Sequence, residues 1–137
     1  MNKIEVLNAH PITRLKRQSF RSCVESVLRW GGVSDATISV ILLDDSALLK
    51  LNRDYLNHNY FTDVMTFPLE VEPLEGEIYI SVDRARDQAD ERSIPLYEEV
   101  SRLAIHGTLH LLGYDDKTEQ ERKAMIQLEN KFLKQVG

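Results

Sequence analysis

Two histidines four residues apart, His106 and His110, are the side chains best placed to do chemistry in this chain. On an α-helix, residues i and i+4 lie on one face, so both imidazoles can reach the same metal ion. If that ion is zinc, each nitrogen would lie about 2.0–2.1 Å from it. Gly113 can end the helix, because glycine accepts the left-handed conformation of a C-terminal cap. The chain can then double back and offer a third ligand from residues 114–116.

A purely structural role for the two histidines is the alternative, with Asp116 simply starting the next helix. The helix predicted over residues 95–112 counts against it, because apolar side chains occupy most of its circumference and such a helix is normally buried. One apolar face holds Leu96, Val100, Leu103, Ala104, Gly107 and Leu111, and another holds Ile105, Leu109 and Leu112. Imidazoles without partners would be unfavourable in such surroundings. We therefore favour a metal site and expect Leu103 and Leu111 in the core.

The composition is that of one ordinary globular domain spanning residues 1–137, with 42% hydrophobic and 28% charged residues. No apolar run approaches the roughly 20 residues of a membrane span, so no membrane association is expected. Cys23 is the only cysteine, which excludes an internal disulfide. Residues 1–5 do not resemble a signal peptide, and a reducing, cytoplasmic location is therefore expected.

The net charge of −5 does not by itself favour nucleic-acid binding, but the basic residues are unevenly distributed. Residues 11–30 contain five basic side chains against one acidic side chain, Glu25. Three of them, Arg14, Arg17 and Arg21, share one stripe at helical spacing and could contact RNA phosphates. A solvated helix face is the plain alternative, and it stays open.

Hydrophobic periodicity predicts an α/β (α+β) domain with about four strands in a mixed sheet and four or five helices. The predicted strands cover residues 3–8, 37–43, 63–67 and 77–82, and Pro68 is expected to end the third. Helices are predicted over residues 13–30, after an N-cap at 44–46, around 85–89, over 95–112, and from 118 onward. Thr118 and Glu121 have the spacing of a capping box.

The segment His106–Asp116 resembles the signature of the YbeY family, His-Gly-x-Leu-His-Leu-x-Gly-Tyr-Asp-His, at all but its last defined position. Residues 62–68, Thr-Asp-Val-Met-Thr-Phe-Pro, are similar to the family's Thr-Asp-Val-Leu-Ser-Phe-Pro. Residues 76–81 are similar to its Gly-Asp-Ile-x-Ile-Ser strand. The resemblance runs in order from about Leu42 to the C-terminus.

YbeY proteins are metal-dependent endoribonucleases of bacterial ribosomal RNA maturation. The resemblance therefore implies a zincin-like domain with one Zn²⁺ per chain and a single-strand-specific endoribonuclease activity. It implies a role at the 3′ end of 16S rRNA and in ribosome quality control. The implied partners are single-stranded rRNA, the small ribosomal subunit and ribosome-associated assembly factors.

Two positions depart from the family pattern. The third histidine of the signature aligns with Asp116, and since a carboxylate is a competent zinc ligand, the predicted ligands are His106, His110 and Asp116. Leu56 stands where the family usually has an arginine, a natural candidate for contacting RNA phosphate. Arg53, one helical turn earlier, could take that role or could simply be solvated.

Two further aspartates have candidate supporting roles, and the catalytic residues are otherwise unassigned. Asp115 aligns with the family's own aspartate and is expected to orient a ligand or stabilise the turn. Asp63 either belongs to a turn before a strand or lies beside the metal, where it would orient a histidine or a water.

Three other functions compete with an endoribonuclease. A zincin metalloprotease would carry His-Glu-x-x-His, but Gly107 occupies the position of the glutamate base. A non-haem iron oxygenase also uses two histidines and a carboxylate, although the helical i, i+4 pair favours zinc. A non-catalytic ribosome assembly factor with a structural metal is the strongest rival.

Overall fold

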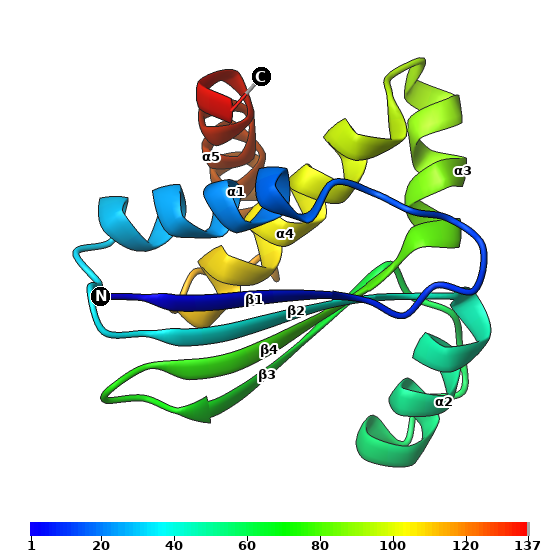
Figure 1. The fold of residues 1–137 in the computed structure, drawn as a ribbon, viewed down its shortest axis with the longest axis horizontal. Coiled ribbons are helices and arrows are strands. Elements are labelled where there is room, and N and C mark those ends of the chain that lie inside the picture. Colours follow the sequence, from blue (N-terminus) through cyan, green and yellow to red (C-terminus); the bar gives the residue numbers. More distant parts are fainter. Residues whose placement is uncertain (137) are drawn as a thin grey trace.

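Four strands form one mixed sheet in the computed structural model, which describes residues 1–136 (Figure 1). The strands are β1 (Lys3–Asn8), β2 (Thr37–Leu43), β3 (Val64–Glu70) and β4 (Glu75–Ser81). Their spatial order is β1-β2-β4-β3, with β1, β2 and β4 parallel and β3 antiparallel to β4. The fold class predicted from the sequence, a four-stranded mixed sheet in an α+β domain, is confirmed.

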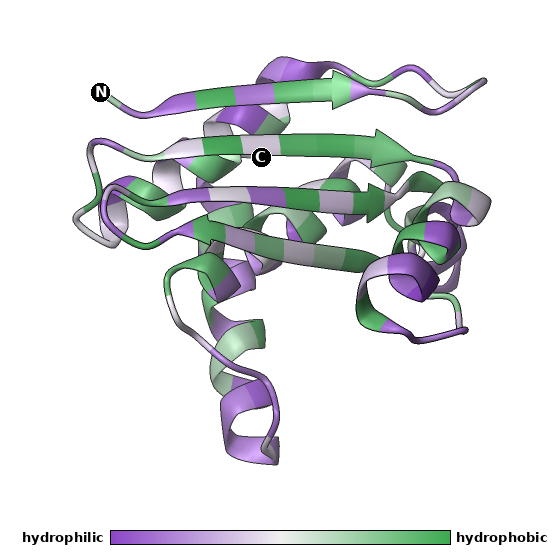
Figure 2. Ribbon diagram, turned by 90° about the horizontal axis from the view of Figure 1, so that it is seen from below, coloured by the Kyte–Doolittle hydropathy of each residue, from purple (hydrophilic) through white to green (hydrophobic). Residues whose placement is uncertain are grey.

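Five helices accompany this sheet in the described part of the chain: α1 (Arg17–Trp30), α2 (Asp45–Leu56), α3 (Val82–Arg92), α4 (Leu96–Leu111) and α5 (Glu119–Val136). Helices α1, α4 and α5 lie on one side of the sheet and α2 lies on the other (Figure 1). Figure 2 views the sheet from the side of α2, with the other helices behind it. Within residues 1–136, none of the helices has both the length and the apolar character to cross a bilayer.

The main core lies between the sheet and helices α1 and α4. Strand β2 alternates, so that Ile38, Val40 and Leu42 are fully buried on the face toward the helices. Helix α4 approaches this face closely at Gly107, where an added Cβ would lie 2.7 Å from Ile78 Cγ2. Because a larger residue would push α4 away from the sheet, Gly107 determines the distance between this helix and the sheet.

Helix α4 is buried on two faces, as its apolar pattern predicts. Leu103, with an exposed fraction of 5%, belongs to the core against the sheet, and the partly buried Leu111 packs against Gly76. Ile105 and Leu109 belong to a second core shared with α1 and α5. The remaining face of α4 carries Arg102, His106 and His110, whereas the polar Ser101 and Thr108 are buried on another face of the helix.

Several predicted helix ends are confirmed by hydrogen bonds and dihedral angles. The Asp44 carboxylate accepts from Ala47 N at 2.8 Å and caps α2. Thr118 and Glu121 exchange side chain–backbone hydrogen bonds of 3.0 Å before α5, as a capping box requires. Gly113 has a φ of +103°, which turns the chain away from α4.

Two predictions of local structure are wrong. Pro68 lies inside β3 rather than after it, because β3 is an edge strand and proline's missing N–H is tolerated there. The first helix begins at Arg17 and not near residue 13. Arg14 therefore lies before the helix and does not share a helical stripe with Arg17 and Arg21.

The burial of α4 predicts a large loss of stability for Leu103→Ala. Removing this side chain should lower the free energy of unfolding by about 2–5 kcal/mol, as for other large-to-small core changes. The matched control is Ile126→Ala on α5, whose side chain is 52% exposed and should change stability by no more than about 0.5 kcal/mol. Chemical denaturation measures both, and a loss within about 0.5 kcal/mol for Leu103→Ala would contradict this packing of α4.

Candidate metal centre

Three side chains predicted as metal ligands, His106, His110 and Asp116, come together at the C-terminal half of α4. One ligand atom from each lies within 4.8 Å of the others, and the three side chains are half-buried. The two Nε2 atoms of the histidines face each other at 2.9 Å. The Asp116 carboxylate oxygens lie 3.4 Å from His106 Nε2 and 3.6 Å from His110 Nε2. This group could hold a metal ion.

The separations of these atoms fit a metal ion. Tetrahedral ligands about 2.1 Å from an ion lie about 3.4 Å from one another, by simple geometry from ordinary bond lengths. The Nε2 atoms of the two histidines are 2.9 Å apart, Asp116 Oδ2 lies 3.4 Å from His106 Nε2, and Asp116 Oδ1 lies 3.6 Å from His110 Nε2, which are separations of that order. Two imidazole nitrogens and a carboxylate that converge this closely can share a metal cation, and without one the 2.9 Å contact is a hydrogen bond between the two imidazoles.

A buried carboxylate, Glu129 on α5, fixes the orientation of His106. The Nδ1 atom of His106 donates to Glu129 Oε2 at 2.7 Å, and Glu129 is only 5% exposed. With the proton held on Nδ1, the lone pair of the imidazole lies on Nε2, which points to His110 and Asp116. A carboxylate that holds a metal-ligating histidine in this way fixes its tautomer and strengthens it as a ligand.

Negative charge collects around His106. Burial of the imidazole lowers the pKa of His106, but the hydrogen bond and charge of Glu129, together with the charges of Asp116 and Asp63, more than offset this. The pKa of His106 therefore lies above its ordinary value of 6.5. The same charges that favour a proton on this imidazole favour a metal cation beside it.

A chain of ion pairs runs from Glu129 across α4 to α3. Arg102 Nη1 donates to Glu129 Oε1 at 3.3 Å, and Arg102 Nε lies 3.5 Å from Glu99. Arg92 on α3 donates to the same Glu99 carboxylate at 2.6 Å. Glu99 is 1% exposed, and burial raises the pKa of its carboxyl although both arginines oppose the rise. These pairs anchor Glu129 and therefore the ring of His106.

Asp63 reaches the same place from the start of β3. A cavity of about 170 Å³ beside His106 is lined by Asp63, Gln88, Arg92, Glu99, Arg102, Leu103, His106 and Glu129. Gln88 Nε2 donates to Asp63 Oδ2 at 3.2 Å, which holds the carboxylate in this cavity. The structure thus brings Asp63 beside His106 of the candidate metal centre, where it adds negative charge.

The turn after α4 places Asp116 beside the two histidines and Asp115 in solvent. Tyr114 N donates to Leu109 O at 3.0 Å, which closes the helix, and Arg122 of α5 donates to Lys117 O at 3.0 Å. Asp116 faces the two histidines, whereas Asp115 is exposed to solvent. The geometry therefore agrees with the alignment of Asp116 to the third ligand position.

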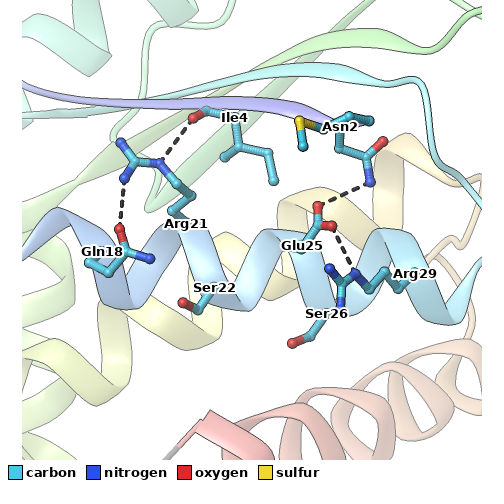
Figure 3. A pocket seen from close by; sticks show the side chains of 9 residues that line it. Asn2, Ile4, Gln18, Arg21, Ser22, Glu25, Ser26 and Arg29 are labelled. Carbon is cyan, nitrogen blue, oxygen red and sulfur yellow. Dashed lines mark hydrogen bonds and ion pairs between the residues drawn. The ribbon is translucent and has the colours of Figure 1, made fainter.

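The arginines considered for RNA contact do not gather at this centre. Arg21 lies on α1 beside the free edge of β1, where its Nε donates to Ile4 O at 3.1 Å and its Nη1 donates to Gln18 at 2.8 Å (Figure 3). Arg14 donates to the carbonyl oxygens of His10 and Thr13. Arg17 is exposed at the start of α1. Arg21 thus stabilises a sheet edge, whereas Arg14 and Arg17 are both exposed to solvent.

Arg53 and Leu56 lie on α2, on the other side of the sheet from α4 (Figure 1). Both side chains are exposed, and Arg53 makes only a 3.8 Å ion pair with its neighbour Asp54. An RNA strand that contacts both α2 and the metal centre must therefore pass around an edge or an end of the sheet.

Gly107 also bears on the metalloprotease alternative. Its Cα faces the sheet, where an added Cβ would meet Ile78 and lie 3.2 Å from Thr66 Cγ2. A glutamate at this position would displace α4, so the helix has no room for the general base of a His-Glu-x-x-His protease. This observation argues against peptide hydrolysis.

Glu129 is the functional residue that sequence reasoning missed. It lies on an apolar face of α5, four residues after Met125 and three before Phe132, both of which are buried. An acidic side chain on an otherwise apolar helix face indicates that it is buried and paired with a polar or charged partner. The identity of that partner depends on how α5 crosses α4, which periodicity does not specify.

Comparisons with known proteins point to one family. A family model described as Endoribonuclease YbeY matches residues 5–137. A protein named Endoribonuclease YbeY from Flavobacterium psychrophilum is 39% identical over 117 residues, covering 85% of this chain and 84% of that protein. The protein of that name from Persephonella marina is 32% identical over 143 aligned positions, covering 99% and 94%. A solution structure of the Thermotoga maritima protein TM1509 matches with a TM-score of 0.69 and 26% identity, covering 99% of this chain and 89% of that one.

The position of Glu129 predicts that Glu129→Gln weakens metal binding without removing a ligand. Loss of the carboxylate should reduce metal affinity about 10–100-fold, the usual effect of losing such a partner. The matched control is Glu119→Gln on the same helix, whose side chain is 78% exposed and should leave affinity unchanged. Competition with a chelating indicator dye measures both constants, and equal affinities for the two variants would show that Glu129 does not act on the site.

Proposed function

The chain belongs to the YbeY family of endoribonucleases, and we propose that it is a zinc-dependent enzyme that cleaves single-stranded ribosomal RNA. The proposed role is maturation of the 3′ end of 16S rRNA and ribosome quality control in the cytoplasm. The proposed partners are the small ribosomal subunit and its assembly factors. These finer statements rest on the family relationship and on the chemistry of the metal centre.

One observation supports a catalytic rather than a structural metal: the group contains three candidate ligands. Structural zinc sites are closed by four protein ligands, whereas catalytic sites keep one position for water or substrate. Among the described residues, the cluster consists of His106, His110 and Asp116. Glu129, a further carboxylate at this site, already accepts from His106 Nδ1. The fourth position is therefore available to an RNA phosphate or a water molecule.

Different residues of the chain would bind the metal ion and orient its ligands at this site. Zinc bound there would polarise a phosphoryl oxygen or lower the pKa of a water molecule. His106 Nε2, His110 Nε2 and an Asp116 oxygen would hold the ion, and Glu129 keeps the proton of His106 on Nδ1. The carboxylate of Asp116 reduces the net positive charge relative to a three-histidine site. Because that charge stabilises the phosphate in the transition state, we expect a slow enzyme.

The proposal also includes contacts to the RNA backbone. Of the arginines considered, Arg14, Arg17 and Arg53 are exposed, but Arg14 and Arg21 already donate to backbone carbonyl oxygens, which leaves Arg17 and Arg53 to reach phosphates. Contacts to phosphate fix the position of an RNA strand but do not read its sequence. Cleavage selectivity is therefore assigned to the surroundings of the metal centre.

The choice of ligand at the turn predicts an order of metal retention among three variants. Asp116→Ala should lose zinc, whereas Asp115→Ala, the matched control in the same turn, should retain it because Asp115 is exposed. Asp116→His restores the family's ligand and should bind at least as tightly as the natural chain. Metal analysis after dialysis measures retention, and greater loss in Asp115→Ala would reverse the assignment.

The activity itself is tested by single-turnover cleavage of an end-labelled single-stranded rRNA fragment, with the matching duplex alongside. The zinc-loaded chain should cut the single strand only, and chelator or His110→Ala should abolish cutting. His58→Ala, which removes an exposed histidine, is the matched control and should remain active. The product ends show whether water or the 2′-hydroxyl attacks.

A non-catalytic assembly factor makes the opposite prediction. If zinc-loaded protein in excess over RNA cuts nothing, and His110→Ala supports ribosome maturation in cells as well as the natural chain, the catalytic proposal fails.

A further inference from the structure

A second candidate site lies on the sheet face that α1, α4 and α5 leave uncovered. Figure 2 shows this face, with α2 at one end of it. A cavity of about 290 Å³ opens there between α2, β3 and β4. Its lining consists of Leu51, Tyr55, Phe67, Leu69, Glu77 and Tyr79. The candidate metal centre is across the sheet, so this cavity shares no residue with it.

Three aromatic rings from three different elements line this cavity. The centroids of Tyr55 and Phe67 are 6.0 Å apart with an interplanar angle of 73°. The centroids of Phe67 and Tyr79 are 5.6 Å apart with an interplanar angle of 88°. The plane of Phe67 therefore stands nearly perpendicular to both neighbours. Rings at such angles present both π faces and ring edges to the same cavity. Aromatic cages that bind organic cations have the same kind of arrangement.

The charge of the cavity lining also favours binding of a cation. Glu77 carries the one carboxylate of this lining, and the lining contains no basic residue. Glu77 and Tyr79 lie two residues apart on the same face of β4 and both line the cavity, and burial together with the Glu77 carboxylate raises the pKa of Tyr79. Within the described residues, the cation–π contacts involve Arg84 with Phe61 and Lys131 with Trp30 and Phe132. No cation of the chain itself thus occupies the rings of this cavity.

We propose that this cavity binds an arginine side chain of a partner polypeptide. A planar guanidinium stacks on aromatic faces and donates to a carboxylate at the same time, and it is less strongly hydrated than an ammonium group. Tyr55 and Leu69, which are 70% and 54% exposed, form an open rim that a side chain on a peptide backbone can cross. A purely apolar partner would bury Glu77 without a counter-charge, which is unfavourable.

The test is an NMR titration of the isotope-labelled full chain with three capped tripeptides, Gly-Arg-Gly, Gly-Lys-Gly and Gly-citrulline-Gly. Citrulline has nearly the shape of arginine without its charge. The arginine peptide should shift the resonances of Tyr55, Phe67, Glu77 and Tyr79. The citrulline peptide should bind about fivefold to thirtyfold more weakly, the range expected for a cation over aromatic rings.

Two variants complete the test. Glu77→Gln should lose the preference for arginine over citrulline. Glu5→Gln is the matched control and should keep it, because Glu5 is an exposed acid that aligns with Glu77 across Ser39 on the same sheet face but does not line the cavity. Equal binding of arginine and citrulline peptides, equal or tighter binding of the lysine peptide, or shifts outside this cavity would overturn the proposal.

Discussion

The hydrogen bond from His106 Nδ1 to the buried Glu129 carboxylate connects the fold to the chemistry of the site. It joins α4 to α5, and it decides which imidazole nitrogen faces His110 and Asp116. The carboxylate can stay buried because Arg102 donates to its other oxygen, and Arg102 in turn lies beside Glu99. A buried charge without partners would be strongly destabilising, so the orientation of His106 in the candidate metal centre depends on the ion-pair chain that keeps Glu129 in place.

The short distance between α4 and the sheet is the second constraint on the position of the two histidines. Gly107 allows the helix to approach Ile78, and the Leu111 side chain packs against Gly76, where a larger residue would clash with it. Since two faces of α4 are thereby buried, the remaining stripe presents both histidines to the turn that carries Asp116. Gly113 turns the chain there with its positive φ, and the capping box of Thr118 and Glu121 starts α5, which brings Glu129 back to His106.

Much of this arrangement could be predicted from the sequence, because local chemistry determines it. The i, i+4 histidines, Gly113 and the capping box each act over a few residues. The failures come from tertiary context. Pro68 is tolerated because β3 is an edge strand, and Arg14 lies outside α1, facts that depend on sheet order and on where the chain leaves β1. Glu129 and the aromatic cavity depend on how distant elements cross, which periodicity alone does not specify.

The replacement of the family's third histidine by Asp116 makes the coordination itself the most direct test of this account. Anomalous diffraction at the zinc absorption edge, from crystals of the metal-loaded chain, locates the ion and its ligands. The account predicts one ion bound by His106 Nε2, His110 Nε2 and an Asp116 oxygen at about 2.0–2.2 Å, with a water molecule as fourth ligand and Glu129 on His106 Nδ1. An ion closed by a fourth protein ligand, or bound elsewhere on the chain, would contradict it.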